Sequence, residues 1–396
     1  MDRGRSTRST AARAAAAAAL RRAAPRGAAS SIVALGIGLA MLATGCAADQ
    51  SEQRPAADRS DERVDERRAE RAERRGANDG WRLTPGERRF APGDGRLTPG
   101  ESWWEAPVVP TFDRQARQRL KLEVARSRAA GSRAGVFAKI GDSNSDYPAN
   151  LYGLGCRPVR FAPRYRDLAP TLRRYRSTRL GSLRTFPGCR PANSFSRDSA
   201  AAVAGVWTRW LLTPVADLPL TEVIEVSPEC GRRQTPLGCE LNLLRPRYAL
   251  IMIGSNDVVL GRPLGPFLAT QLARVISRVR AHGTVPVLST LPPLGEYIPG
   301  NDQIEEVNAL IVHVARRLRV PLINVWRAMQ GPRMINEGLG LDDVHLGAYQ
   351  GDTSPEILRH SAVLTKEAIR NGANRRNLLW LQVLRRLDRV AGSGRP

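Results

Sequence analysis

The sequence predicts a doubly wound α/β sandwich, in which helices cover both faces of a parallel sheet. The first observation is a set of short apolar runs without polar alternation, such as residues 135–140 and 248–253. Such runs are typical of strands that are buried on both faces. The second is that these runs alternate with longer segments whose apolar residues recur at helical spacing. This alternation indicates right-handed crossovers between parallel strands.

The elements follow one another in a regular order. Strands are expected at residues 135–140, 248–253, 285–288 and 320–325. A helix is expected between the second and third of these strands, with Gly283 as its stop, because its apolar residues have helical spacing: Leu268, Leu272, Val275, Ile276 and Val279. A further helix is expected at residues 304–318. In such sheets the reactive site lies at the carboxyl ends of the strands, so candidate residues should follow strands.

The 396 residues divide into three regions. Residues 1–45 resemble a signal peptide, because a basic stretch precedes an apolar run at 32–42 that is too short to span a bilayer. Residues 46–110 are expected to form a flexible tether of charged and Pro/Gly-rich sequence. Residues 111–396 are expected to form the folded domain, with an insertion at about 151–240 in which we also expect the second strand.

The end of the apolar run suggests a lipid anchor. Small residues precede Cys46 in the segment Leu-Ala-Thr-Gly-Cys, which resembles a bacterial lipobox, although its leucine stands one place early. We expect cleavage before Cys46 and acylation of its thiol, which would place the protein at the cell envelope. An ordinary signal peptide followed by a chance cysteine is the alternative.

The tether contains little that could fold by itself. Residues 54–75 are rich in arginine and acidic residues and poor in apolar ones. The sequence Arg-Leu-Thr-Pro-Gly-Glu then occurs twice, at Arg82–Glu87 and Arg96–Glu101, as a duplicated linker. Near its end we expect Trp103 and Trp104 to dock onto the folded domain, although contact with a sugar is an alternative.

Without Cys46, four cysteines remain, all in the expected insertion: Cys156, Cys189, Cys230 and Cys239. A turn-rich loop separates the last two, so we expect Cys230 to pair with Cys239 and Cys156 with Cys189. A zinc site is the rival explanation, but no Cys-x-x-Cys pattern or neighbouring histidine supports it. Disulfides require an oxidising compartment, in agreement with export.

The composition is strongly basic. There are 61 Lys and Arg against 38 Asp and Glu, a formal net charge of +23. Such a charge attracts polyanions of any kind. No helix-turn-helix, RNP or zinc-finger pattern accompanies it, so we do not expect a nucleic-acid partner. Seven arginines in the insertion form either a solvated face or the rim of a site for an anionic substrate: Arg160, Arg164, Arg166, Arg173, Arg174, Arg176 and Arg179.

Three short motifs combine into a catalytic hypothesis. Gly-Asp-Ser places Ser143 directly after the first strand, and Gly-Ser-Asn-Asp places Asn256 after the strand at 248–253. Asp-Asp-Val-His places Asp342 three residues before His345, past the last predicted strand. Asp343 is a competing partner for the imidazole, but adjacent side chains point apart. A serine nucleophile, a histidine base, a carboxylate that orients it and oxyanion donors are the parts of a serine ester hydrolase.

This ordered set resembles the SGNH/GDSL hydrolase family over roughly residues 130–390. The resemblance implies a flavodoxin-like three-layer α/β/α sandwich and no metal or organic cofactor. It implies that Ser143 is the nucleophile and donates its own N–H to the oxyanion. It further implies that Asn256 is a side-chain oxyanion donor, that His345 is the general base and that Asp342 orients it.

One sequence block of that family is only partly matched. The family supplies a glycine whose N–H completes the oxyanion hole, and the best-matching stretch is residues 193–200. Arg197 stands at the glycine position, with Ser194 and Ser196 as rivals. We expect a backbone donor at Arg197, because a backbone N–H does not depend on the side chain. An arginine there would also be able to hold an acidic or acylated substrate.

The sequence therefore predicts an exported ester hydrolase that acts on a small acyl ester, with acetyl groups on envelope or extracellular carbohydrate as the expected substrate. An O-acyltransferase with the same triad is the first alternative. A non-catalytic envelope-binding lipoprotein on the same scaffold is the second.

Overall fold

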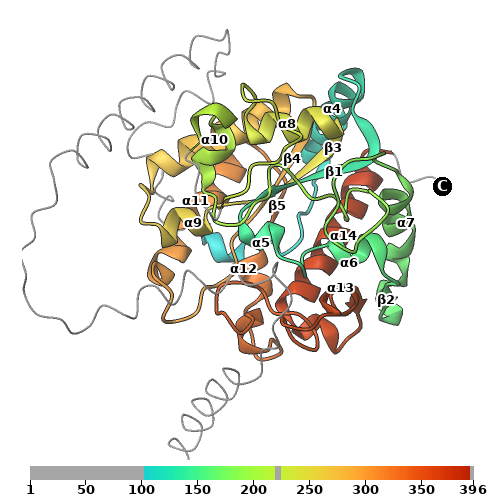
Figure 1. Ribbon diagram of the computed structural model, residues 1–396, viewed down its shortest axis with the longest axis vertical. Coiled ribbons are helices and arrows are strands. Elements are labelled where there is room, and N and C mark those ends of the chain that lie inside the picture. The colour runs from blue at the N-terminus through green and yellow to red at the C-terminus, as the bar shows by residue number, and fades with distance from the viewer. Residues whose placement is uncertain (1–101, 219–223, 393–396) are drawn as a thin grey trace, which may run out of the picture. The chain divides into compact units, whose positions relative to one another are not determined.

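The computed structural model describes residues 102–218 and 224–392. Its centre is a parallel sheet of four strands in the order β1-β3-β4-β5 (Figure 1). The strands are β1 (Arg133–Gly141), β3 (Pro246–Met252), β4 (Val285–Ser289) and β5 (Leu322–Ile323). All four lie within or around the runs predicted from the sequence, and β5 is shorter than expected. The prediction of an α/β fold with a parallel sheet is therefore confirmed.

Burial explains why these strands lack polar alternation. Every residue of β3 is buried, as are the last seven residues of β1. Tyr248 and Met252 contact the C-terminal helix α14 (Gly372–Val390), since the Tyr248 hydroxyl donates to Asp388 and the Arg376 guanidinium contacts the Met252 sulfur. Alternate residues of a strand point to opposite faces, so Ala249 and Ile251 face the other layer. A sheet covered on both faces must be apolar throughout.

Two groups of helices cover the sheet. One group comprises α8 (Pro236–Leu244), α10 (Pro266–Ala281) and α11 (Ile304–Arg317), which pack against β1 and β4 and against one another. The other comprises α4 (Arg114–Ala129), α7 (Ala169–Ser177) and α14, which pack against β1, β3 and β4 and against one another. Helix α10 ends as predicted, because Gly283 follows its C-cap with a φ of 71°.

Short elements connect these layers. The short helices are α5 (Ser143–Asp146), α6 (Tyr152–Cys156), α9 (Ser255–Val259), α12 (Val325–Ala328) and α13 (Ile357–His360). The 3-10 helices are Trp103–Glu105, Pro163–Leu168, Thr208–Leu212, Val215–Asp217, Asn301–Gln303, Asn336–Gly338 and Ala368–Arg370. No helix among the described residues combines the length and the apolar character that a membrane span requires.

The strand that the structure forms within the insertion does not belong to the central sheet. The named strand in the insertion, β2 (Arg160–Phe161), pairs with β6 (Val363–Leu364) in a small separate sheet. The place beside β1 is instead taken by residues 201–203. There Gly141 donates to the Ala201 carbonyl and accepts from the Val203 N–H, and the pairing is parallel. This segment extends the sheet at its β1 edge and ends next to the loop that follows β1.

The predicted docking of Trp103 onto the folded domain is confirmed, whereas Trp104 remains half exposed. Trp103 is 4% exposed and packs against Val312 of α11 and the ring of Trp326, whereas Trp104 is 50% exposed. The end of the expected tether at residues 102–110 is therefore held against the folded domain. Its earlier part, together with the signal-like segment and Cys46, lies outside the described residues.

Both predicted disulfides are present. Cys156 pairs with Cys189 and Cys230 pairs with Cys239. The first links the end of α6 to the loop before residue 193, and the second links a loop to α8. The alternative of a zinc site is wrong, because all four thiols are used in these bonds.

Candidate active site

The site begins at the carboxyl end of β1, where the chain turns sharply into α5. A Cβ on Gly141 would lie 2.0 Å from the Met252 carbonyl oxygen and 2.2 Å from the Ser145 hydroxyl oxygen, so only glycine fits between the two strand ends. Asp142 then caps α5 by accepting the Asn144 N–H at 3.0 Å. Ser143 is the first residue of this short helix and is partly exposed. The turn thus presents Ser143 at the edge of the sheet.

Asp142 also connects this turn to the next one. Its second oxygen accepts the N–H of Ser255 at 3.2 Å, at the start of the helix that carries Asn256. The Asp142 side chain is fully buried, and burial raises its pKa to about 6, against the lowering effect of these hydrogen bonds and of the His345 charge. Sequence reasoning assigned no role to Asp142. Its position between Gly and Ser at the end of a strand was the available signal.

The structure brings Asp342 and His345 together. His345 Nδ1 lies 2.6 Å from Asp342 Oδ2, and Asp342 Oδ1 accepts the N–H groups of Val344 and His345. Burial raises the pKa of Asp342, but the bond to His345, its charge and the two N–H donors outweigh it, so the pKa lies below its usual value. A carboxylate that stays ionised can hold the imidazole in one tautomer and stabilise its protonated form.

Asp343 points elsewhere. Its backbone has a φ of 58°, and its carbonyl accepts the Gly295 N–H at 2.7 Å. Asp342 is thus the carboxylate at His345, and Asp343 joins the histidine loop to the loop after β4.

The histidine loop lies against the turn that carries Ser143. The Asn144 side-chain amide donates to the Val344 carbonyl at 3.4 Å, and the Tyr147 ring stacks on the His345 ring at 4.7 Å between centroids. His345 Nε2 is buried and has no hydrogen-bond partner among the described residues. The imidazole therefore has its Nδ1 occupied by Asp342 and its Nε2 available, as a general base next to a serine requires.

Asn256 and Asp257 are neighbours on α9 but have different hydrogen-bond partners. The Asn256 amide donates one N–H to the Val206 carbonyl at 2.9 Å, which leaves its second N–H for another acceptor. Asp257 accepts both the N–H and the hydroxyl of Thr208 at 2.9 Å. Asp257 thus fixes the turn, and Asn256 is oriented by Val206, which follows the segment that extends the sheet.

The expectation for Arg197 needs correction. Its backbone N–H donates to the Asn193 carbonyl at 2.9 Å, so it does not serve an oxyanion. Its guanidinium is buried and bonds Glu240 at 2.9 Å and Glu229 at 2.6 Å. Of the two rivals, Ser196 is also engaged, since its N–H donates to Asn193 Oδ1 at 3.2 Å. The Ser194 hydroxyl accepts the Phe137 N–H in the interior. Ser194, Ser196 and Arg197 are all buried, which fits a structural role.

Gly205 is a better candidate for the missing donor. It follows the segment that pairs with Gly141 and directly precedes Val206, whose carbonyl holds Asn256. Its φ of 79° is a conformation that favours glycine, and its N–H has no hydrogen-bond partner among the described residues. The preceding N–H, of Ala204, faces Asp146 at the end of α5 and acts to lower the pKa of that carboxyl. Sequence reasoning missed Gly205 because its position depends on this long-range pairing.

The surface beside the histidine loop carries exposed apolar side chains. Tyr297 is 88% exposed and Leu341 is 80% exposed. They lie on the two loops joined by the bond between Gly295 and Asp343. Among the described residues no group of three or more His, Cys, Asp or Glu side chains is arranged to hold a metal ion.

Comparison with known proteins gives one family match. Residues 193–349 match the model of the GDSL-like lipase/acylhydrolase family. The matched residues include Gly205, Asn256, Asp342 and His345, whereas Ser143 precedes them. Among solved structures, a GDSL-like lipase from Bacteroides thetaiotaomicron is 16% identical, over 47% of this chain and 74% of that chain, with a TM-score of 0.31. No curated protein matches the chain.

Proposed function

We propose that this chain hydrolyses a small acyl ester with Ser143 as nucleophile. The match of residues 193–349 to the GDSL-like lipase/acylhydrolase family, a family of esterases, supports this proposal. The observation that carries this proposal is the Asp342–His345 pair. The His345 Nε2 has no hydrogen-bond partner in the part of the chain that the structure describes, and the loop that carries it contacts the Ser143 turn. These groups have the types and the local order that a Ser-His-Asp mechanism requires.

The reaction proceeds through an acyl-enzyme. Ser143 Oγ attacks the ester carbonyl while its proton passes to His345 Nε2, and Asp342 stabilises the imidazolium that forms. The oxyanion receives N–H donors from Ser143, Gly205 and the Asn256 amide. The imidazolium then gives its proton to the departing alcohol. Water, deprotonated by His345, attacks the acyl-enzyme, releases the carboxylic acid and restores Ser143.

Labelling of the full chain with a fluorophosphonate probe tests this assignment, because the probe forms a covalent adduct only with an activated serine. We expect one adduct on Ser143 by mass spectrometry and release of acetate from acetylated substrates. Ser143→Ala should lose both. Ser145→Ala is the matched control, since the Ser145 hydroxyl donates to the Met252 carbonyl, and it should keep the adduct. A wild-type chain without an adduct would show that the scaffold is non-catalytic.

The preferred ester is proposed to be an acetyl group on an envelope or extracellular carbohydrate. Tyr297 supports this, because an exposed phenol ring beside the histidine loop offers both an apolar face and a polar edge to a sugar. Acetate release from acetylated xylan or chitin fragments, compared with release from a simple alkyl acetate, tests the preference. A higher kcat/KM for the alkyl ester than for every sugar ester would contradict it.

Export and lipid anchoring at Cys46 are part of the same proposal. The two disulfides support it, because such bonds persist in oxidising compartments. Expression of the full chain in bacteria with an alkyne-labelled fatty acid should label the protein, and Cys46→Ser should remove the label. Labelling that survives in Cys46→Ser would refute this assignment.

A further inference from the structure

Arg376 is a charged side chain that the proposed reaction does not use and that is 1% exposed. It stands near the start of α14 and reaches under the nucleophile turn, where its Nη1 donates to the carbonyl of Asn144 at 2.8 Å. Arginine is seldom fully buried without a paired carboxylate. Its burial directly beneath the residue after Ser143 therefore calls for an explanation.

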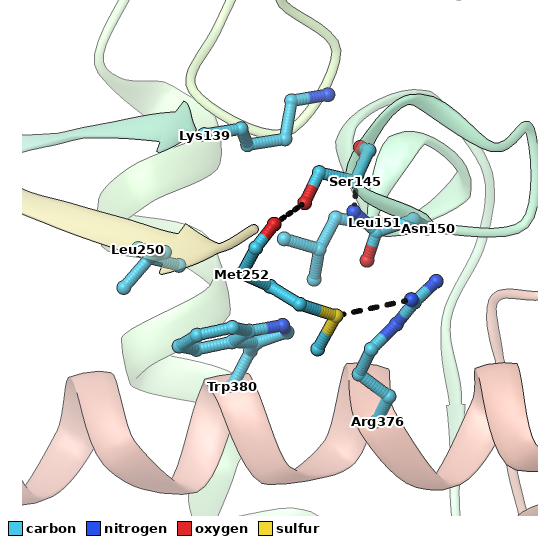
Figure 2. Close-up of a pocket in the computed structure, with 8 residues that line it drawn as sticks. All are labelled: Lys139, Ser145, Asn150, Leu151, Leu250, Met252, Arg376 and Trp380. Carbon is cyan, nitrogen blue, oxygen red and sulfur yellow. Dashed lines mark hydrogen bonds between the residues drawn. The ribbon is translucent and has the colours of Figure 1, made fainter. Parts of the chain in front are cut away.

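Arg376 has few other partners. Its Nη1 also contacts the Met252 sulfur at 3.9 Å, whereas its Nε and Nη2 have no hydrogen-bond partner among the described residues. Figure 2 shows the guanidinium extending from α14 toward Asn150 and Ser145, at one side of a small cavity. The cavity measures about 10 Å³, close to the space one water molecule needs. So small a space leaves the charge poorly screened.

The nucleophile turn is consequently held from two sides. Asp142 accepts the N–H of Asn144, and Arg376 donates to the carbonyl of the same residue. Arg376 carries a charge opposite to that of Asp142, and this interaction opposes the effect of burial, which lowers the pKa of the guanidinium to about 9. The guanidinium therefore stays protonated at neutral pH.

Helix α14 is itself well anchored at this point. The neighbouring Asn377 accepts the Leu151 N–H at 3.0 Å and donates to the Ala149 carbonyl at 2.9 Å. Asn150 in turn donates to the Ser145 carbonyl at 2.7 Å. The arginine thus extends from a fixed platform onto the backbone of the turn that carries the nucleophile.

We propose that Arg376 is a positioning residue for the nucleophile: through the Asn144 carbonyl it holds the α5 turn so that the Ser143 hydroxyl and N–H keep the geometry that attack on the ester requires. This inference rests on the proposed function of Ser143. Its chemical basis is that a charge-assisted hydrogen bond in a poorly hydrated site is short and strong and restrains the backbone it contacts. Small displacements of a nucleophile cost large factors in rate.

The test compares Arg376→Gln and Arg376→Lys with the wild-type full chain. Arg389→Gln is the matched control, because it makes the same change at an exposed position on the same helix. The readouts are the rate constant of fluorophosphonate labelling at Ser143 and kcat and KM for 4-nitrophenyl acetate. All are measured below the unfolding temperature of each variant. Labelling of the wild-type chain establishes the function of Ser143 independently of Arg376.

We expect Arg376→Gln to lower kcat and the labelling rate at least about tenfold while KM changes less than about threefold, because positioning acts on the reacting state. Arg376→Lys should recover part of the loss, since an ammonium can still donate to the Asn144 carbonyl. Arg389→Gln should match the wild type. A folded Arg376→Gln with wild-type kcat and labelling rate overturns the proposal. So does a folded lysine variant that is no better than the glutamine variant.

If Arg376→Gln does not fold, Arg376→Lys is compared directly with the wild type. A kcat lowered about threefold or more at unchanged KM then supports positioning, because the lysine donor is shorter and lacks the planar fork. An unchanged kcat overturns it. A role confined to stability would lower the unfolding temperature without changing the rate constants of the folded protein.

Discussion

The carboxylate of Asp142 accepts the backbone N–H of Ser255 at 3.2 Å, and so joins the turn that presents Ser143 to the turn that presents Asn256. The same side chain caps α5 through the Asn144 N–H. Because Asp142 is fully buried, its negative charge is kept at a cost that hydrogen bonds only partly offset. The candidate nucleophile and the candidate oxyanion donor are thus positioned by one buried charge.

Asp142 should make the stability of the fold depend on pH. The pKa of Asp142 is raised from 3.8 to about 6 in the folded chain, so the folded state binds a proton more readily than the unfolded state. Its contribution is therefore fully present below about pH 3.8 and is lost as the pH rises through about 6. Relative to Asp142→Asn, the wild type should gain about 1.4 kcal/mol of unfolding free energy between pH 7.5 and pH 5. Urea unfolding of both proteins at the two pH values measures this, and a constant difference would contradict it.

Asp342 and Asp343 form a matched pair for testing the role of the carboxylate. Asp342→Asn should lower kcat by about 10³–10⁴-fold, because it loses the charge that stabilises the imidazolium and favours the wrong tautomer. Asp343→Asn makes the same chemical change beside it. Asn tolerates the positive φ of this position, and the bond to Gly295 uses the backbone, so kcat should stay within about threefold. Equal losses in both variants would exclude the assignment of Asp342 alone.

Gly205 can be tested against a second glycine with similar backbone geometry. Gly205→Ala and Gly181→Ala both place a side chain at positive φ, 79° and 65°, and each should cost about 1–2 kcal/mol of stability. Gly181 has open space around it, so its variant should keep the wild-type kcat. Gly205→Ala should lower kcat roughly 10²-fold, because the oxyanion loses a correctly placed donor. Similar kcat values for the two variants would argue against Gly205 as a donor.

Arg197 should affect stability and leave the chemistry nearly unchanged. Arg197→Met leaves the fully buried Glu240 carboxylate without its partner, which should cost about 3–5 kcal/mol. The double variant Arg197→Met/Glu240→Gln removes both charges and keeps an acceptor for the Ala200 N–H, so it should recover much of that loss. Urea unfolding measures the cycle. A kcat in the folded double variant lowered 100-fold would instead indicate a direct role for Arg197.

The two disulfides should differ in their contribution to stability. They close segments of 33 and 9 residues, and the chain-entropy model gives about 4 kcal/mol for Cys156–Cys189 and about 3 kcal/mol for Cys230–Cys239. Replacing each pair with serine and measuring urea unfolding compares them. The Cys156/Cys189 variant should be the less stable, and the reverse order would show that native-state contacts outweigh loop closure.

Much of the fold could be predicted from local pattern. The apolar runs of β1, β3 and β4 are visible because a strand buried on both faces cannot carry polar residues, and the helices between them follow from apolar spacing. The order of Ser143, Asn256 and His345 along the chain, each at or after a strand end, placed them at one edge of the sheet. The disulfide partners followed from number and loop composition.

What the sequence determined by itself is therefore the layered α/β architecture, the disulfide pairs and the candidate catalytic side chains, because hydrophobic periodicity and side-chain type are local properties. Tertiary structure decided which backbone groups lie near the candidate site. Residues 201–203 pair with Gly141, and Gly205 then directly precedes Val206, whose carbonyl holds Asn256, whereas Arg197 lies in a buried ion pair. It also placed Asp142 and Arg376 on either side of Asn144. The surroundings of a backbone N–H or of a buried charged side chain depend on contacts between segments that are distant in the sequence. They therefore cannot be predicted from a local sequence pattern.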